Sequence, residues 1–134
     1  MAAWDRTKVV NSKFKLEGAE LKSLDLSGLD LSKANLISAN LVNANLKEVS
    51  LVGANLFSAK AMRTDFSGAN LSGVNFLKAN LTRANLKESN LNDADLTGAN
   101  LAETNLENAD LIRAKLVEAN LLGANLIGAD FIEA

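Results

Sequence analysis

A five-residue period runs through this 134-residue chain from Leu16 to Phe131 without an insertion or a deletion. Every fifth residue of this stretch is a repeat centre, and the 24 centres comprise twenty Leu, three Phe and one Ala. The residue two before a centre is Ala in sixteen repeats, and the residue just before it is Asn in thirteen and Asp in six. So short and regular a period predicts one repeat domain, in which each unit packs only against its neighbours.

The period also limits the local structure, because five matches neither the 3.6 residues of a helix turn nor the two of a strand. Two apolar positions per repeat, the centre and the position two before it, fit a short extended piece that buries alternate side chains. The two positions after the centre must then form a corner. All eight glycines lie two residues after a centre, where a type II turn needs a positive φ. The sequence therefore predicts an all-β solenoid that turns every five residues.

Runs such as residues 34–38 (Ala-Asn-Leu-Ile-Ser) and 124–128 (Ala-Asn-Leu-Ile-Gly) resemble the pentapeptide repeat family, whose consensus is Ala-(Asp/Asn)-Leu-x-x. The resemblance covers about nine tenths of the chain and extends to the small members abundant in cyanobacteria. It implies a right-handed quadrilateral β-helix with four repeats per coil. The 24 repeats would then make about six coils over residues 14–134. At a spacing of about 4.8 Å per coil, the solenoid would be about 29 Å long.

Four repeats per coil would stack each centre on the residue twenty positions away. The core expected from this stacking includes Leu36, Leu56, Phe66, Phe76, Leu86 and Leu96. We interpret the Asn and Asp phase as structural, with amides stacked along files such as Asn35, Asn55 and Asn75 and with bonds to the corner backbone. Residues 60–64 fit the repeat worst, because Ala61 is a centre and Thr64 takes an Ala position, so we expect a local distortion there.

Residues 1–13 lie outside the repeat phase and are predicted to form an N-terminal cap segment. Trp4, Val9 and Val10 would cover the open first coil. No run of eighteen apolar residues is present, so no membrane span is expected. The first fifteen residues show no secretory signal, and the chain contains no cysteine, so we expect a cytoplasmic location.

The chain contains no His, Cys or Tyr, which removes the commonest general bases, thiol nucleophiles and soft metal ligands. We therefore expect no catalytic, cofactor-binding or metal site, and an enzyme is the least favoured class of function. Asp110 and Asp130 should stack one coil apart, but two carboxylates are too few ligands for calcium.

Charge is uneven along the chain, with 12 basic and 7 acidic residues in 1–87 but 2 basic and 9 acidic residues in 88–134. Some members of the pentapeptide repeat family, which this sequence resembles, mimic DNA in shape and charge and bind type II topoisomerases such as gyrase. The acidic end keeps such a DNA mimic as the alternative function, although the basic first part disfavours it. Direct nucleic-acid binding is not expected, because Arg63 and Arg83 share one file without an aromatic platform.

The residue just after each centre should point outward. It is polar throughout the first coil, but in the sixth coil these positions are Val117, Leu122, Ile127 and Ile132. Together with Ile112 and Phe131 they form our candidate interface, beside an uncapped coil whose backbone groups could pair with another chain. A missing C-terminal cap would explain the same pattern. We predict a homodimer through the C-terminal coil and a non-enzymatic protein-interaction scaffold, for which the sequence names no other partner.

Overall fold

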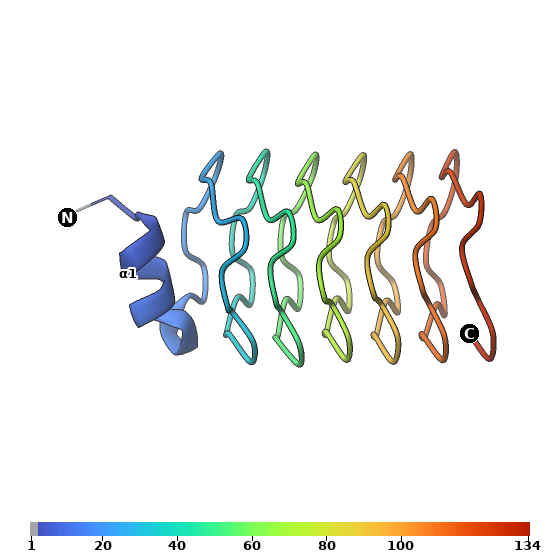
Figure 1. Cartoon of the computed structure of the whole chain (residues 1–134), viewed down its shortest axis with the longest axis horizontal. Helices are drawn as coiled ribbons and strands as arrows, with labels where there is room; N and C mark the ends of the chain where they lie inside the picture. Colours follow the sequence, from blue (N-terminus) through green and yellow to red (C-terminus); the bar gives the residue numbers. More distant parts are fainter. Residues whose placement is uncertain (1–2) are drawn as a thin grey trace.

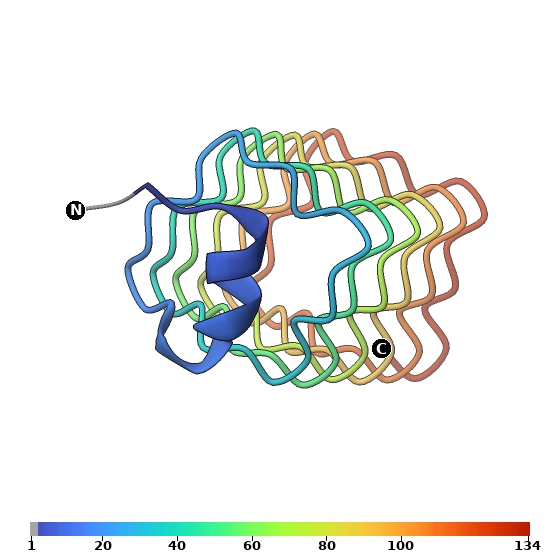
Figure 2. The same cartoon turned by 60° about the vertical axis from the view of Figure 1, so that its left-hand side comes forward.

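The computed structural model describes residues 3–134, so Met1 and Ala2 of the predicted cap lie outside the described residues. The described chain begins with the helix α1 (Arg6–Asn11) and the short 3-10 helix η1 (Lys13–Lys15), and continues as a stack of coils (Figure 1). Seen from the helical end, the coils have four sides and lie one behind another, with α1 across the opening of the first (Figure 2). The fold is thus a straight four-sided rod with a helix at one end.

The coils are held in register by parallel bridges between residues twenty apart. Nineteen such bridges join the described coils, from Glu20↔Asn40 to Asp110↔Asp130, and each bridge lies at the residue just before a repeat centre. A repeat of twenty residues is four pentapeptides, which confirms the predicted four-repeat coil. Each side is too short to form a regular strand, because a corner follows every three residues.

The corners are β-turns that begin at the repeat centres. In the first turn the N–H of Ala19 donates to the carbonyl of Leu16 over 3.0 Å, and this bond recurs around the coils. All 24 third residues of these turns have a positive φ, between +55° and +73°. A turn with a positive φ at its third residue alone is type II, as predicted. Sixteen of these residues are not glycine, so the fold imposes left-handed geometry on ordinary side chains as well.

The Asn and Asp residues complete the hydrogen bonding of this backbone. In the repeats that have a coil on both sides, the N–H groups of the centre, the third turn residue and the residue before the next centre bond to adjacent coils, and a fourth closes the turn. The fifth N–H, just after the centre, has no place in these ladders. In 18 of the 19 repeats with Asn or Asp before the centre, that side chain accepts this N–H over 2.9–3.2 Å. At Asp110 the N–H of Ile112 instead reaches Asn92, one coil away, over 2.9 Å.

The predicted role of these residues at the corner backbone is therefore confirmed. The Asn residues also stack in files as predicted, but their amides form almost no hydrogen bonds with one another. Among the described residues, one hydrogen bond joins two Asn side chains of the same file, from Nδ2 of Asn120 to Oδ1 of Asn100 over a long 3.4 Å. The amide of Asn40 donates instead to Glu20 over 2.9 Å. The file of Asn35, Asn55 and Asn75 forms none, and each of their side-chain oxygens accepts the N–H of its own corner. An Asx side chain satisfies the nearest backbone donor first.

The core is one continuous column along the rod axis. The six predicted core residues are completely buried: Leu36, Leu56, Phe66, Phe76, Leu86 and Leu96. The Ala residues two before the centres are also buried in the inner coils, which leaves room for the large side chains from four sides. Burying a Leu side chain contributes about 1.5–3 kcal/mol, so the column is the main source of stability.

The expected distortion at residues 60–64 is not present. Lys60 bridges to the coils on both sides, and Arg63 has the same positive φ as the other corner residues. Thr64 is completely buried, and its hydroxyl donates to the carbonyl of Leu41 over 2.7 Å. This bond lets a polar side chain take an Ala position without leaving a buried polar group unpaired.

The N-terminal segment packs against the first coil. Asp5 caps α1 by accepting the N–H of Lys8 over 2.8 Å. Val9 is completely buried, and Trp4 and Val10 pack against the core cluster. Phe14 occupies a position that the repeat phase predicts to be inward, yet it lies in η1 and is 65% exposed. Regular coiling begins at Leu16, since the helical backbone before it directs Phe14 outward.

Candidate interaction surface

Four large apolar side chains surround the last coil, residues 116–134. The exposed fractions are 64% for Val117, 78% for Leu122, 72% for Ile127 and 60% for Ile132. Each follows a repeat centre and therefore stands at one of the four corners. The structure places them as a ring around the end of the rod, which we call the apolar ring, and not on one side of it.

The other two residues of the predicted interface lie in different settings. Phe131 is a repeat centre that packs against the core and is only half-buried, because the last coil is covered on one side alone. Ile112 lies one coil further in, in the same file as Ile132, and is half-buried. Leu126, another centre of the last coil, is 39% exposed, although the sequence predicted no exposed centre. The end face thus combines the ring with partly exposed core residues.

The backbone of the last coil has an unpaired edge. In the preceding five coils, the N–H of each centre donates to a carbonyl of the next coil, as the N–H of Leu111 does to the carbonyl of Asp130 over 2.7 Å. The corresponding N–H groups of Leu116, Leu121, Leu126 and Phe131 have no carbonyl partner among residues 3–134. An edge of this kind favours pairing with another backbone.

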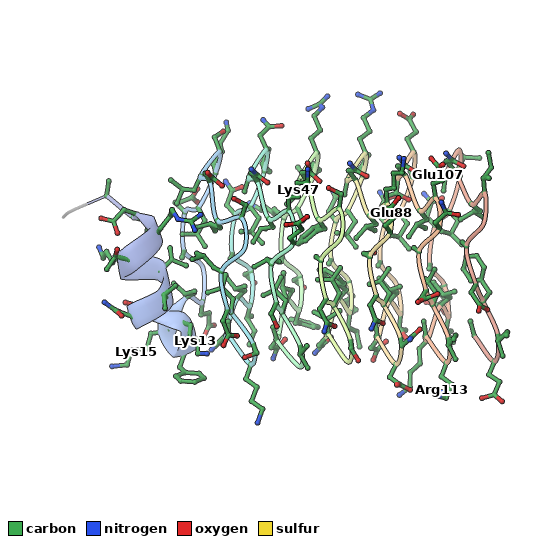
Figure 3. All side chains as sticks on the ribbon, in the orientation of Figure 1. Lys13, Lys15, Lys47, Glu88, Glu107 and Arg113 are labelled. Carbon is green, nitrogen blue, oxygen red and sulfur yellow. The ribbon has the colours of Figure 1, made fainter. Side chains whose placement is uncertain are left out.

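Ion pairs between coils neutralise part of the acidic half. Arg113 donates to both carboxylate oxygens of Asp93 over 2.8 and 3.1 Å. These bonds lower the pKa of Asp93 and raise the pKa of Arg113. Arg83 pairs with Glu103 over 2.6 Å, and Lys87 approaches Glu107 to 3.8 Å. Glu107 and Arg113 lie at different corners near the far end of the rod (Figure 3).

These ion pairs were not predicted from the sequence, although the signal for them was present. Each of the three pairs joins residues twenty positions apart, so writing the sequence in rows of twenty would have aligned them. A plain count of charges in 88–134 treats these carboxylates as free, whereas three of the nine acidic residues of that segment form ion pairs.

A shallow depression of about 260 Å³ lies at Ser67 and Gly68, where small side chains leave space between neighbouring coils. Lys47 and Glu48 line one side of it and Lys87 and Glu88 the other. Lys47 and Glu88 lie on the same side of the rod (Figure 3). The two cations and two carboxylates balance, so the depression favours neither an anion nor a cation.

Asp110 and Asp130 are paired one coil apart, as predicted. Within the described part of the chain, no three metal-binding side chains of the His, Cys, Asp and Glu types come together. Among residues 3–134, no helix has the length and hydrophobicity needed to cross a membrane.

The sequence matches the family described as Pentapeptide repeats, with eight copies over residues 15–51, 50–87, 64–101, 79–116 and 104–134. No match was found among curated proteins. The structure is similar to that of QnrB1, a plasmid-mediated fluoroquinolone resistance protein, with a TM-score of 0.79 and 21% identity over 88% of this chain. This chain spans 60% of the length of that protein.

Two further similar structures are those of proteins described as pentapeptide repeat proteins. Rfr23 from the cyanobacterium Cyanothece 51142 has a TM-score of 0.52 and 27% identity, covering 85% of this chain and 88% of that one. A protein from the Arabidopsis thaliana thylakoid lumen has a TM-score of 0.51 and 31% identity, covering 86% and 66%. The coil of four pentapeptides and the family match agree, so the chain belongs to the pentapeptide repeat family and folds as its right-handed quadrilateral β-helix.

Proposed function

We propose that this protein is a non-enzymatic interaction scaffold that forms a homodimer through its C-terminal coil. The observation that carries the proposal is the apolar ring of Val117, Leu122, Ile127 and Ile132 around an unpaired backbone edge. Surface of this kind favours association, because burial removes apolar area from water and the edge gains hydrogen-bond partners. The last coil of a second copy of this chain would supply both an apolar surface and an unpaired backbone edge.

The geometry favours an end-to-end dimer over a side-by-side one. The ring is spread over four corners, so only a partner placed on the rod axis can cover all of it. Glu118, Asp130 and Glu133 also lie in this coil. A two-fold axis through the centre would bring like charges together, so we expect the two rods to be offset. The dimer would present the sides of both rods to other proteins.

Pentapeptide repeat proteins are generally interaction or structural modules, and the residues of this chain agree with that role. Without His, Cys or Tyr, the candidates for proton transfer are carboxylates and lysines. The four Asp residues with shifted pKa values have them lowered, by hydrogen bonds from Ser27, Ser32 and Thr97 and by Arg113. A general base needs a pKa nearer neutrality. The predicted cytoplasmic location stays a prediction.

The DNA-mimic alternative is supported by the acidic residues of the last two coils, residues 96–134. Opposing it, Asp93, Glu103 and Glu107 already have cationic partners, which interrupts any regular row of negative charge. A gyrase supercoiling assay separates the two functions. Inhibition by micromolar protein would favour the mimic, and no inhibition would remove it.

The dimer is tested by light scattering across micromolar concentrations. We expect the mass of a dimer for the wild type and of a monomer for Leu122→Glu with Ile127→Glu. The matched control is Val52→Glu with Ala102→Glu, which adds the same two charges on the sides of the rod and should stay dimeric. Circular dichroism checks that every variant is folded. A wild type that is monomeric throughout the concentration range would refute the dimer.

A further inference from the structure

One side of the rod is basic in three consecutive coils. It consists of residues 33–43, 53–63 and 73–83, which we call the basic side. These segments contain Lys33, Lys60, Arg63, Lys78 and Arg83 and no acidic residue. Parallel bridges hold them in register, because Asn55 pairs with Asn35 and Asn75 and Lys60 with Asn40 and Asn80.

The opposite side of the same coils has a different charge. Residues 44–52, 64–72 and 84–92 contain two basic and three acidic side chains. The charge of the basic side is therefore not a general property of the N-terminal half. It is confined to two adjacent faces out of four.

Apolar side chains accompany these cations. Ile37, Phe57 and Leu77 follow one another along one corner, and Val42 and Met62 along the next. All five are half-buried, although they point outward from the coils. On the opposite side of these coils, Val52 is the single large apolar residue at an outward position. The basic side thus has two apolar files along its corners, with Lys60 on the face between them and Lys78 at the corner beside Leu77.

Most of these cations have no carboxylate beside them. Arg83 pairs with Glu103 of the next coil over 2.6 Å. Lys33, Lys60, Arg63 and Lys78 form no ion pair with any residue of the described chain. Lys60, Arg63 and Lys78 are exposed, so their charges are available to a partner.

We propose that the basic side binds an acidic protein segment that carries apolar side chains. Carboxylates of the segment would meet Lys60, Arg63 and Lys78, while its apolar side chains would pack on Phe57 and its neighbours in the file. Complementary charge of this kind guides association and sets the register of a complex. The proposal rests on the scaffold function above and gives that function a surface and a partner chemistry.

A nucleic acid fits this surface less well. Single-stranded nucleic acids bind where cations alternate with aromatic rings on which bases stack. Phe57 is the single aromatic residue among the outward positions of the basic side, and its neighbours in the file are aliphatic. Aliphatic files beside cations match leucine- and glutamate-rich protein segments better.

The test uses fluorescence anisotropy of a labelled peptide rich in Glu and Leu. In one companion peptide every Glu is replaced by Lys, and in the other every Leu is replaced by Ser. An oligothymidylate serves as the nucleic-acid probe. We expect the Glu and Leu peptide to bind the protein, and each companion and the oligonucleotide to bind about tenfold more weakly or not at all. The affinity should fall with added salt.

Variants locate the binding on the rod. Lys60→Glu with Arg63→Glu should weaken binding of the Glu and Leu peptide by about tenfold or more. Lys47→Glu with Lys87→Glu makes the same change of charge on the opposite side and should leave the affinity within about twofold. Phe57→Ser should weaken binding, whereas its control Val52→Ser should not. Circular dichroism shows whether each variant retains the wild-type coil.

Several outcomes would overturn the proposal: equal binding of the Lys peptide, equal loss in the Lys47 and Lys87 control, or tighter binding of the oligonucleotide. The measurements are repeated with the Leu122→Glu and Ile127→Glu variant, whose end face is altered but whose basic side is intact. Peptide binding by that variant would support the basic side even if light scattering refuted the dimer. If the protein is a dimer but binds no peptide, the proposed binding by the basic side is refuted and the proposed dimer is not.

Discussion

Phe66 and Phe76 meet edge to face inside the rod, with their ring centroids 5.8 Å apart and their planes at 75°. Ten residues separate them, which is half a coil, so the two rings reach the axis from opposite sides and from successive coils. Ala61, the one small centre, lies in the same coil as Phe66. The two largest buried side chains therefore lie in the same stretch of the rod as the smallest centre.

This contact predicts a coupling between the two rings. Phe66→Leu and Phe76→Leu should each destabilise the fold, and the double mutant should be less destabilised than the sum of the two. An edge-to-face pair contributes about 0.5–1.5 kcal/mol beyond its buried area. Chemical denaturation of the four proteins gives this coupling energy. A coupling of zero within error would show that the rings do not interact.

Inward and outward positions should differ in their effect on stability. Leu86→Ala removes a completely buried centre and should lower the free energy of unfolding by about 2–5 kcal/mol. Asn45→Ala removes the acceptor of the Lys47 N–H at 3.0 Å and should cost about 1 kcal/mol. Urea unfolding measures both, and equal losses would contradict the separation into core and corner.

The buried hydroxyl of Thr64 should stabilise the coil at residues 60–64. Thr64→Val keeps the shape of the side chain and removes its bond to the carbonyl of Leu41, so we expect a loss of about 0.5–1.5 kcal/mol. Thr82→Val at an outward corner is the control and should have a smaller effect. A variant as stable as the wild type would show that the bond is not needed.

Acid should destabilise the fold. The hydroxyl of Thr97 lowers the pKa of Asp95 below its usual value of 3.8, and the hydroxyls of Ser27 and Ser32 do the same for Asp25 and Asp30. A carboxyl group whose pKa is lower in the folded state stabilises the protein above its unfolded-state pKa. That stabilisation is lost as the pH falls through the folded-state pKa, so unfolding midpoints should drop below about pH 4.

Asp95→Asn identifies one contributor to this loss. The amide oxygen can still accept the Thr97 N–H, but it does not titrate, so the variant should lose less stability than the wild type between neutral and acidic pH. Urea midpoints at several pH values test this expectation. An identical pH dependence in both proteins would exclude Asp95 as a contributor.

The sequence predicted the coil because one period controls every level of the structure. The glycine phase alone identified the corner residue, and the positive φ of Lys78 or Glu88 follows from that phase even without glycine. The Asn positions were interpreted less well, because sequence alone does not show whether a side-chain amide bonds to its own corner or to the next amide in the file. Residues 60–64 were misjudged because the contact of Thr64 with Leu41 spans 23 positions.

The candidate interface could be predicted only in part. The identity of the four apolar ring residues follows from their phase, but their exposure depends on which neighbours cover them. Ile112 and Val117 show this difference, because both directly follow a centre, yet a further coil half-buries Ile112 and leaves Val117 64% exposed. The ion pairs between coils depend on side-chain reach as well as register, so sequence alone gives only candidate partners.

The twenty-residue register has a consequence for how such a rod can change. Inserting or deleting one pentapeptide would preserve the core, because almost every centre is Leu or Phe and any of them stacks on any other. It would also rotate every later residue by a quarter turn about the axis. Leu77 would no longer follow Phe57, and Glu103 would no longer face Arg83. The number of repeats between two surface residues therefore determines whether they lie on the same side of the rod. This relation is independent of the stability of the fold.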